Sequence, residues 1–342
     1  YHAFLPSELR RYFGDESWDI EEFYFTRKGE RVGFWRSFNL VVIARKNSRG
    51  IGSSKLEHPM SFLRYNDPMP AKKVTILDVP FDAVTYREAL EAVERTVQGG
   101  KREHWVTANP EMLVQAETNP DFLHLLKNAE MILPDGAGIL WAATYLQKTP
   151  PNNRFLRYFH WLGSLAGIAL IPSRYHRVIP QRVTGIDLMV QIVEQSQHKG
   201  WRMFLLGAEP GVAQIAAENL KHRYSEVQIV GTCAGNPALE EEEEICRRIN
   251  ETAPDILFVA YGSPAQEFWI ARNLNKFTTV KMAMGVGGAF DFIAGKIRRA
   301  PRWMRTLGIE WMWRLYKQPK RFKRIWRAAV LFPRLVLRER LS

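Results

Sequence analysis

The stretch that decides the fold is Met131-Ile132-Leu133-Pro134-Asp135-Gly136-Ala137-Gly138. An apolar run reaches an acidic residue where proline and two glycines turn the backbone, and a helical pattern follows over 139–146. Asp135 is therefore expected at the carboxyl end of a strand, the edge where open α/β sheets bind ligands. A carboxylate there either caps the following helix, which is the commoner role, or accepts a proton from a substrate.

The same alternation of strand and helix continues on both sides of this stretch. Strands are expected at 74–79, 105–108, 131–133, 203–206, 227–232, 256–261 and 280–286. Helices are expected at 85–97 with Thr85 as cap, from Pro110 onward, and at 139–146, 211–224, 239–250 and 264–274. Short apolar strands separated by such helices predict an α/β fold, Rossmann-like in the broad sense, with a mostly parallel sheet covered by helices on both faces.

The regions outside this repeat have different patterns. Residues 1–46 show a helix start at Leu5 to Leu9 and a buried strand at 39–46, and they faintly resemble the last part of a class I methyltransferase domain. The glycine-rich cofactor loop of such a domain is absent, so we interpret this region as a remnant or extension. Residues 47–72 are predicted to be a linker, and residues 73–295 form the α/β domain.

An insertion at 147–180 interrupts the α/β domain. Its centre, FLRYFHWLGSLAGIALI (155–171), is aromatic at one end and aliphatic at the other. A buried hairpin and a helix lying in a membrane interface explain this pattern about equally well. No uninterrupted apolar run reaches the roughly 18 to 20 residues that a spanning helix needs.

The positive charge is concentrated in residues 296–342. This segment holds fifteen Lys and Arg against two acids, a charge of +13, whereas the whole chain has a net charge of +12. Apolar residues recur at helical spacing in two successive stretches, 304–315 and 322–329. Two basic amphipathic helices with tryptophan predict binding to an anionic membrane surface. An ordinary solvated face is the alternative, and nucleic acid is disfavoured because the apolar faces are aromatic and continuous.

The sequence contains no motif typical of a metal site or of redox chemistry. Cys233 and Cys246 are too few for a disulfide framework or a metal cluster, and the eight histidines are scattered without H-E-x-x-H spacing. We therefore expect no metal, no cofactor, and a reducing, cytosolic setting without a secretory signal. A nucleotide-dependent dehydrogenase is disfavoured because no dinucleotide fingerprint is present.

Polar and glycine-rich turns follow several of the expected strands. Three of them carry Thr107 and Asn109, then Asp135, then Gly262 and Gln266, and capping alone would explain any one of them. Other glycine turns, suited to a phosphate or nucleotide, contain Gly207, Gly211, Gly287, Gly288 and Asp291. For the turn at 207–211, a plain tight turn is the commoner meaning.

Six blocks in order give the chain a specific resemblance. They are TANPEM (107–112), LPDGAGI (133–139), RVTGIDL (182–188), FLLGAEPG (204–211), GSPAQEFWI (262–270) and GVGGAFDFIAGKIRRAPRWMRTLGIEWMWRL (285–315). From Val74 to about Arg327 the sequence resembles the WecG/TagA/CpsF glycosyltransferases, family 26. Residues 1–72 and most of the insertion lie outside this resemblance.

The resemblance implies a function and roles for residues. The family transfers N-acetylmannosamine-type or related sugars from UDP donors to lipid-linked acceptors in cell-surface polysaccharide synthesis, such as that of teichoic acid. By motif, Asp135 is expected as general base, Thr107 and Asn109 as positioning residues, and Arg182 and Gln266 as polar groups of the pocket. The basic appendage at 296–342 is expected to close over the site and dock on the membrane. Its candidate arginines are Arg298, Arg314, Arg321 and Arg324.

Taken together, these expectations describe an inverting, metal-independent enzyme on the cytoplasmic face of the cell membrane. Its partners would be a UDP-sugar, a polyprenyl-diphosphate-linked sugar and anionic lipid, but not nucleic acid. The alternative is a non-catalytic membrane-tethering adaptor with a degenerate α/β domain, which would not bind UDP. The sequence leaves the donor sugar and a homo-oligomeric state open.

Overall fold

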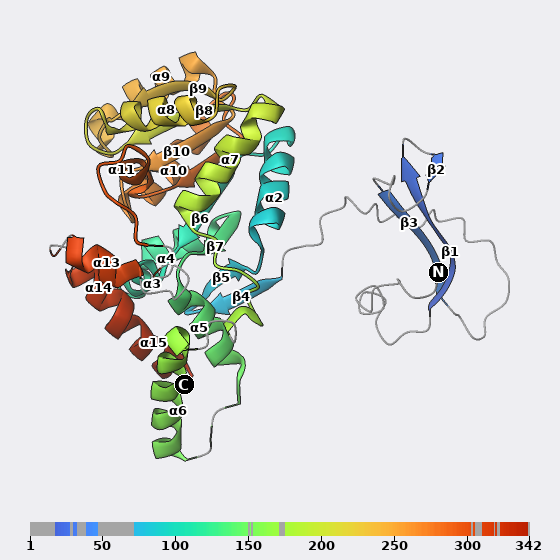
Figure 1. Cartoon of the computed structure of the whole chain (residues 1–342), viewed down its shortest axis with the longest axis vertical. Helices are drawn as coiled ribbons and strands as arrows, with labels where there is room; N and C mark the ends of the chain where they lie inside the picture. The colour runs from blue at the N-terminus through green and yellow to red at the C-terminus, as the bar shows by residue number, and fades with distance from the viewer. Residues whose placement is uncertain are drawn as a thin grey trace. The chain divides into compact units, whose positions relative to one another are not determined.

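The chain forms two compact units, Tyr1–Ala71 and Lys72–Ser342 (Figure 1). The computed structural model describes residues 18–27, 30–32, 39–46, 72–149, 151, 153–170, 175–301, 304, 310–317, 319 and 322–340. In the first unit, an antiparallel sheet of order β2-β1-β3 is built from β1 (Trp18–Arg27), β2 (Glu30–Val32) and β3 (Asn39–Lys46). The expected strand at 39–46 is confirmed. The expected helix start at Leu5 and the linker up to residue 71 lie outside the described residues, and the methyltransferase likeness stays a prediction.

The second unit contains a six-stranded parallel sheet, which confirms the predicted α/β class. Its order is β7-β6-β11-β10-β8-β9. The strands are β6 (Glu103–Ala108), β7 (Met131–Pro134), β8 (Arg202–Gly207), β9 (Gln228–Cys233), β10 (Ile256–Ala260) and β11 (Met282–Gly285). The chain runs outward from β6 to β7 and then crosses to the other half of the sheet, so the two halves meet between β6 and β11. Such a meeting point is where ligands bind in open α/β sheets.

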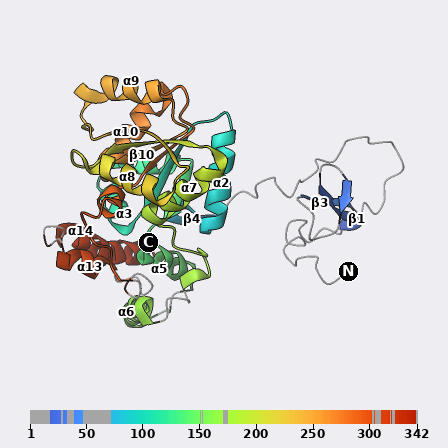
Figure 2. The same cartoon turned by 45° about the horizontal axis from the view of Figure 1, so that its top comes forward.

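Helices cover both faces of this sheet (Figures 1 and 2). One layer contains α2 (Tyr86–Gln98), α7 (Gly185–Lys199) and α8 (Val212–Arg223), and the other contains α4 (Pro120–Asn128), α9 (Glu242–Thr252) and α10 (Ala265–Asn273). Thr85 caps α2 in a capping box with Glu88, as expected from the sequence. On the second face, Phe204, Ile249 and Trp269 belong to one core cluster between sheet and helices.

The expected first strand at 74–79 is wrong as a member of the parallel sheet. Residues there form a separate antiparallel hairpin of β4 (Lys73–Ile76) and β5 (Val79–Asp82). Leu77 and Asp78 both have positive φ, 48° and 64°, so the chain reverses between them. Hairpin turns of this kind usually carry glycine after asparagine or aspartate, and the pair Leu77-Asp78 contains no glycine.

In the described part of the insertion, the aromatic and aliphatic stretch forms a helix, α6 (Arg154–Leu170), and not a buried hairpin. It packs against α5 (Ala137–Gln147), where Trp141 Nε1 donates to Ser164 Oγ at 2.9 Å. On the same side, Trp161 is buried and its Nε1 donates to the carbonyl of Pro333 at 3.1 Å. Among the described residues, no helix combines the length and the hydropathy needed to cross a membrane.

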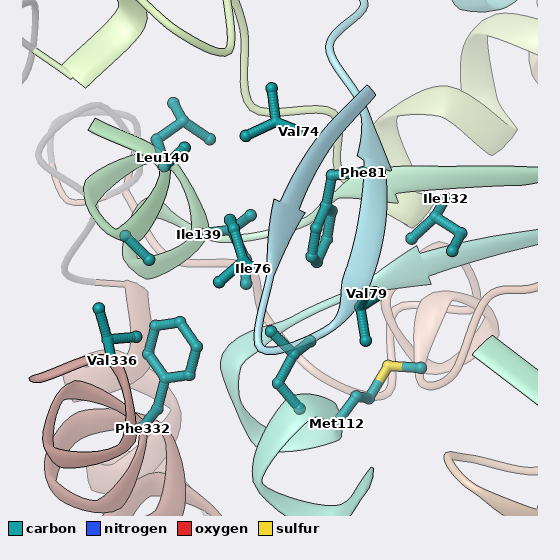
Figure 3. Packing of buried hydrophobic residues seen from close by; sticks show 14 of the residues in the cluster. Val74, Ile76, Val79, Phe81, Met112, Ile132, Ile139, Leu140, Phe332 and Val336 are labelled. Carbon is teal, nitrogen blue, oxygen red and sulfur yellow. The ribbon is translucent and has the colours of Figure 1, made fainter. Parts of the chain in front are cut away.

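The end of the chain belongs to the core of the second unit. It comprises α13 (Glu310–Lys317), α14 (Phe322–Trp326), the π-helical turn η7 (Arg327–Leu331) and α15 (Phe332–Glu339). Phe332 and Val336 are fully buried, and Figure 3 shows them beside Ile139 and Ile76. Phe332 also meets Trp141 edge-on, with ring centroids 6.3 Å apart. The last helix is therefore a structural part of the α/β unit as well as a basic one.

This packing predicts that Phe332→Ala loosens the C-terminal helices. Removing a fully buried phenylalanine typically costs about 3 to 5 kcal/mol. We expect a lower midpoint of thermal unfolding and faster tryptic cleavage in the basic segment after residue 310. The control is Phe322→Ala, because Phe322 is 56% exposed. Equal protease resistance of the two variants would contradict the structural role of α15.

Candidate functional site

A cavity of about 290 Å³ lies at the carboxyl edge of the sheet, where its two halves meet. It is lined by residues at or just after the ends of β6, β7, β10 and β11, by the first two residues of α7, and by one residue of α14. The residues proposed from the sequence that line it are Thr107, Asn109, Asp135, Gly262, Gln266, Gly287, Gly288, Asp291 and Arg324. The structure thus brings together residues that are up to 217 positions apart in the chain.

Asp135 directly follows β7 and is held by the backbone. Its N–H donates to the carbonyl of Ala108 at 2.9 Å, which extends the pairing of β7 with β6. Gly136, with φ of 124°, occupies the N-cap position of α5, so the first residue of the helix, Ala137, lies two positions after Asp135. The Asp135 side chain is partly exposed and lines the cavity. Burial is the main cause that raises the pKa of the nearby Tyr86 phenol, and the carboxylates of Asp187 and Asp135 add to it.

Thr107 is fixed at the point where the two halves of the sheet meet. It is buried, and its Oγ1 donates to the carbonyl of Gly285 on the neighbouring strand at 3.2 Å. Gly185, at the start of α7, approaches so closely that an added Cβ would lie 2.8 Å from this oxygen. The hydroxyl of Thr107 is therefore held in one place beside the cavity.

Asn109 is the N-cap of α3 (Pro110–Glu117), so the capping interpretation is right for this residue. Its Oδ1 accepts from the N–H groups of Glu111 and Met112 at 3.0 and 3.2 Å. With the oxygen engaged, the Nδ2 amino group is the part of Asn109 that can donate to a ligand in the cavity.

Gln266 joins two of the glycine turns that line the cavity. Its Oε1 accepts from the N–H groups of Gly262 and Gly287, at 3.0 Å each. Both glycines have positive φ, 80° and 52°, which suits residues without a Cβ. Because Gln266 takes these two N–H groups, they are not open donors for a phosphate. Gln266 thus stabilises the wall of the cavity. The positive charge that a phosphate needs would have to come from an arginine side chain.

Glu267 follows Gln266, and its burial was not predicted from the sequence. The Gln266 Nε2 donates to its Oε1 at 2.7 Å, and its side chain is almost fully buried. Burial raises the pKa of this carboxyl to about 7, and the hydrogen bond from Gln266 opposes the shift. A Cβ on Gly285 would collide with both side chains. Nothing in the local pattern of α10 distinguishes this acid from an exposed one, so sequence reasoning had no signal for its burial.

Arg324 of α14 lines the cavity and is held there by Glu111. Glu111 is a second residue whose role was not predicted from the sequence. The Nε of Arg324 donates to both carboxylate oxygens of Glu111 at 2.8 Å. Glu111 is mostly buried, accepts from Gln115 at 3.2 Å, and has Arg327 Nη1 within 4.0 Å. An arginine has five N–H donors, so binding through Nε leaves the four on Nη1 and Nη2 for a ligand.

Other proposed residues do not line this cavity. Arg182 lies next to Val183, whose N–H donates to the carbonyl of Pro134 at 3.0 Å. The side chain of Arg182 does not line the cavity. Gly207, with φ of 106°, lets β8 approach β10, because a Cβ there would meet the backbone of Ala260 at about 3 Å. Gly211 is the left-handed N-cap of α8. The plain-turn interpretation therefore describes 207–211 best.

The remaining arginines divide into two groups. Arg298 is exposed, and its carbonyl accepts from Trp313 Nε1 at 3.0 Å. Arg321 and the side chain of Arg314 lie outside the described residues. The binding roles of Arg182, Arg298, Arg314 and Arg321 stay predictions. Within the described part of the chain, no three His, Cys, Asp or Glu side chains are grouped so that they could hold a metal ion.

Comparisons with known proteins agree with the motifs that meet at this cavity. Residues 74–160 and 164–342 match the family model described as "Glycosyl transferase WecG/TagA/CpsF family". An N-acetylglucosaminyldiphosphoundecaprenol N-acetyl-beta-D-mannosaminyltransferase of Staphylococcus aureus (strain MRSA252) is 31% identical over 255 residues, which cover 74% of this chain and 88% of that protein. A protein of the same name from Bacillus spizizenii (strain W23) is 30% identical over 220 residues, covering 64% of this chain and 73% of the relative.

The buried carboxyl of Glu267 predicts a dependence of stability on pH. The carboxyl titrates near its ordinary value of 4.5 in the unfolded chain and near 7 in the fold. Between these values the unfolded chain loses the proton first, so the free energy of unfolding falls as pH rises, by roughly 3 kcal/mol in all. Glu267→Gln should remove this loss. Its midpoint of thermal unfolding, relative to the parent, should be higher at pH 8 than at pH 5.

The control for this experiment is Glu243→Gln. Glu243 is exposed on α9, so its replacement should change the unfolding midpoint by the same small amount at both pH values. If Glu267→Gln behaved in the same way as this control, the buried carboxyl would not carry the predicted pH dependence.

Proposed function

Since this chain belongs to the WecG/TagA/CpsF family of glycosyltransferases, we propose that it transfers an N-acetylmannosamine-type sugar from a UDP-sugar to N-acetylglucosamine on a lipid diphosphate. The names of the two relatives support the sugar and the acceptor. The observation that carries the proposal is the position of Asp135, partly exposed in a cavity where several of the family's sequence blocks meet. The product would serve cell-surface polysaccharide synthesis.

In the proposed reaction, Asp135 is the general base. Its carboxylate takes the proton from an acceptor hydroxyl while that oxygen attacks the anomeric carbon of the UDP-sugar. The new glycosidic bond forms as the bond from the sugar to UDP breaks, and UDP leaves with the electron pair. A single displacement of this kind inverts the anomeric centre. A positioned base contributes about two to four orders of magnitude in rate.

Charge on the departing UDP is proposed to be stabilised by Arg324. Two Nη groups can bind phosphate oxygens in a fork, which a lysine cannot do. Stabilisation of charge where it develops is usually the largest catalytic contribution. Asp291, which lines the cavity, is proposed to accept hydrogen bonds from a ribose or base. No step of this scheme requires a metal ion.

The enzyme is proposed to act as a peripheral protein on the inner face of the cell membrane. The basic charge of residues 296–342 favours anionic lipid, where a lipid-linked acceptor is found. The alternative, a tethering adaptor without catalysis, predicts no affinity for UDP. A thermal-shift measurement separates the two, because UDP at 100 times its dissociation constant would stabilise an enzyme by about 2.7 kcal/mol.

Asp135→Asn should fold and bind UDP but lose turnover by about two to four orders of magnitude, since the amide cannot accept the proton. Turnover is measured by mass spectrometry with a panel of UDP-sugars and a short-chain lipid-diphosphate acceptor, with and without EDTA. Asp121→Asn, at an exposed position of α4, is the matched control. Normal turnover of Asp135→Asn would rule out the base, and loss of turnover in EDTA would rule out metal independence.

Glu111 is predicted to act through Arg324. Glu111→Gln keeps the shape of the side chain but removes the negative charge that holds Nε of Arg324. The KM for the UDP-sugar should therefore rise by about tenfold, with a smaller change in kcat. The control is Glu117→Gln at an exposed position of the same helix. In the background of Arg324→Ala, Glu111→Gln should have little further effect. Additive losses in the double variant would show that Glu111 acts independently of Arg324.

A further inference from the structure

The helix α6 is apolar on both of its faces. Its inner face packs against α5 and α15 through Trp161 and Ser164. Its outer face consists of Phe155, Leu156, Phe159 and Leu162, which are 79%, 58%, 66% and 42% exposed. Spacings of three and four residues place these side chains on one side of the helix. A helix on the surface of a globular protein normally turns a polar face to water, so α6 departs from this pattern.

Another helix of the same unit shows what an ordinary outer face looks like here. In α9, the exposed positions are charged, among them Glu243, Glu244, Arg247 and Glu251. By contrast, α6 contains no Asp or Glu along its 17 residues. A contiguous exposed apolar face of this kind marks a surface that binds a protein or a membrane.

Positive charge on the neighbouring helix α15 favours a membrane over a protein as the partner of this face. In α15, Arg334 and Arg338 are exposed, while Phe332 and Val336 face the core. Figure 1 shows α6 near α15, and the hydrogen bond from Trp161 Nε1 to the carbonyl of Pro333 joins the two helices. An exposed apolar helix without acids, joined to a helix that carries exposed arginines, suits anionic headgroups above a hydrocarbon layer. A second copy of this chain would bring the same positive charge and be repelled.

We propose that the outer face of α6 inserts into the interfacial layer of an anionic membrane, with Arg334 and Arg338 against the headgroups. The helix is too short and insufficiently apolar to span the bilayer, so it lies within one leaflet. This contact is separate from the amphipathic segments α13 and α14. It does not depend on the transferase reaction, and it adds a lipid-binding element from the middle of the chain.

The test replaces the four outer side chains in the full chain, as Phe155→Ser, Leu156→Ser, Phe159→Ser and Leu162→Ser together. Binding is measured by sedimentation with vesicles of phosphatidylcholine alone or mixed with phosphatidylglycerol. We expect the partition coefficient on mixed vesicles to fall at least tenfold, with an unchanged midpoint of thermal unfolding because the side chains are exposed. A matched control, Ile215→Ser with Leu239→Ser, removes exposed apolar side chains outside α6 and should leave binding unchanged.

A second measurement needs no disruptive change. In Phe159→Cys, an environment-sensitive dye is attached to the new thiol, because Cys233 and Cys246 are buried. A blue shift on mixed vesicles, absent with phosphatidylcholine alone, is expected. No blue shift, or full vesicle binding of the four-site variant, would overturn the proposal. So would a dimer in light scattering that the four-site variant converts to monomer, since α6 would then be a self-association surface.

Discussion

The cavity depends on one amide oxygen. Oε1 of Gln266 accepts from Gly262 and Gly287, and so it fixes the turns after β10 and β11 against each other. Backbone N–H groups that are not in a helix or sheet need other acceptors, and one side-chain oxygen serves both turns here. The amide in turn is oriented by Glu267, a carboxyl buried beneath the sheet edge. The site is therefore assembled on a hydrogen-bonded frame that lies behind the residues a substrate would meet.

The C-terminal helices have two roles that cannot be separated by cutting the chain. Phe332 and Val336 complete the core beside Ile139, whereas Arg324 reaches the cavity and is held by Glu111. A chain shortened before these residues would lose packing as well as charge, so point substitutions are the informative changes. Glu111 also restricts the flexible side chain of Arg324, because it binds Nε of that arginine. Less side-chain entropy then remains to be lost when Arg324 binds a ligand.

The sequence predicted the α/β class and the edge of the sheet that holds the site, because strand and helix periodicity and turn residues are local properties. It also placed Asp135 and Thr107 together through the family's motifs, but it left Arg324 as one of four candidate arginines. The hairpin at Leu77 and Asp78 was missed because it lacks the glycine that normally marks such a turn. Glu111, Glu267 and Phe332 were missed for another reason. Their burial is set by partners far away in the chain, and a local pattern carries no information about such contacts.

The hydrogen bond between Trp161 and Pro333 joins a helix from the middle of the chain to the last one. The two lipid contacts proposed for these parts of the chain would act as a bivalent ligand, since the first to attach would raise the effective concentration of the second. Residence time would then grow multiplicatively with the two affinities, while each contact stays individually labile. Attachment of this kind lets a protein diffuse laterally for long periods and still leave when either contact is weakened.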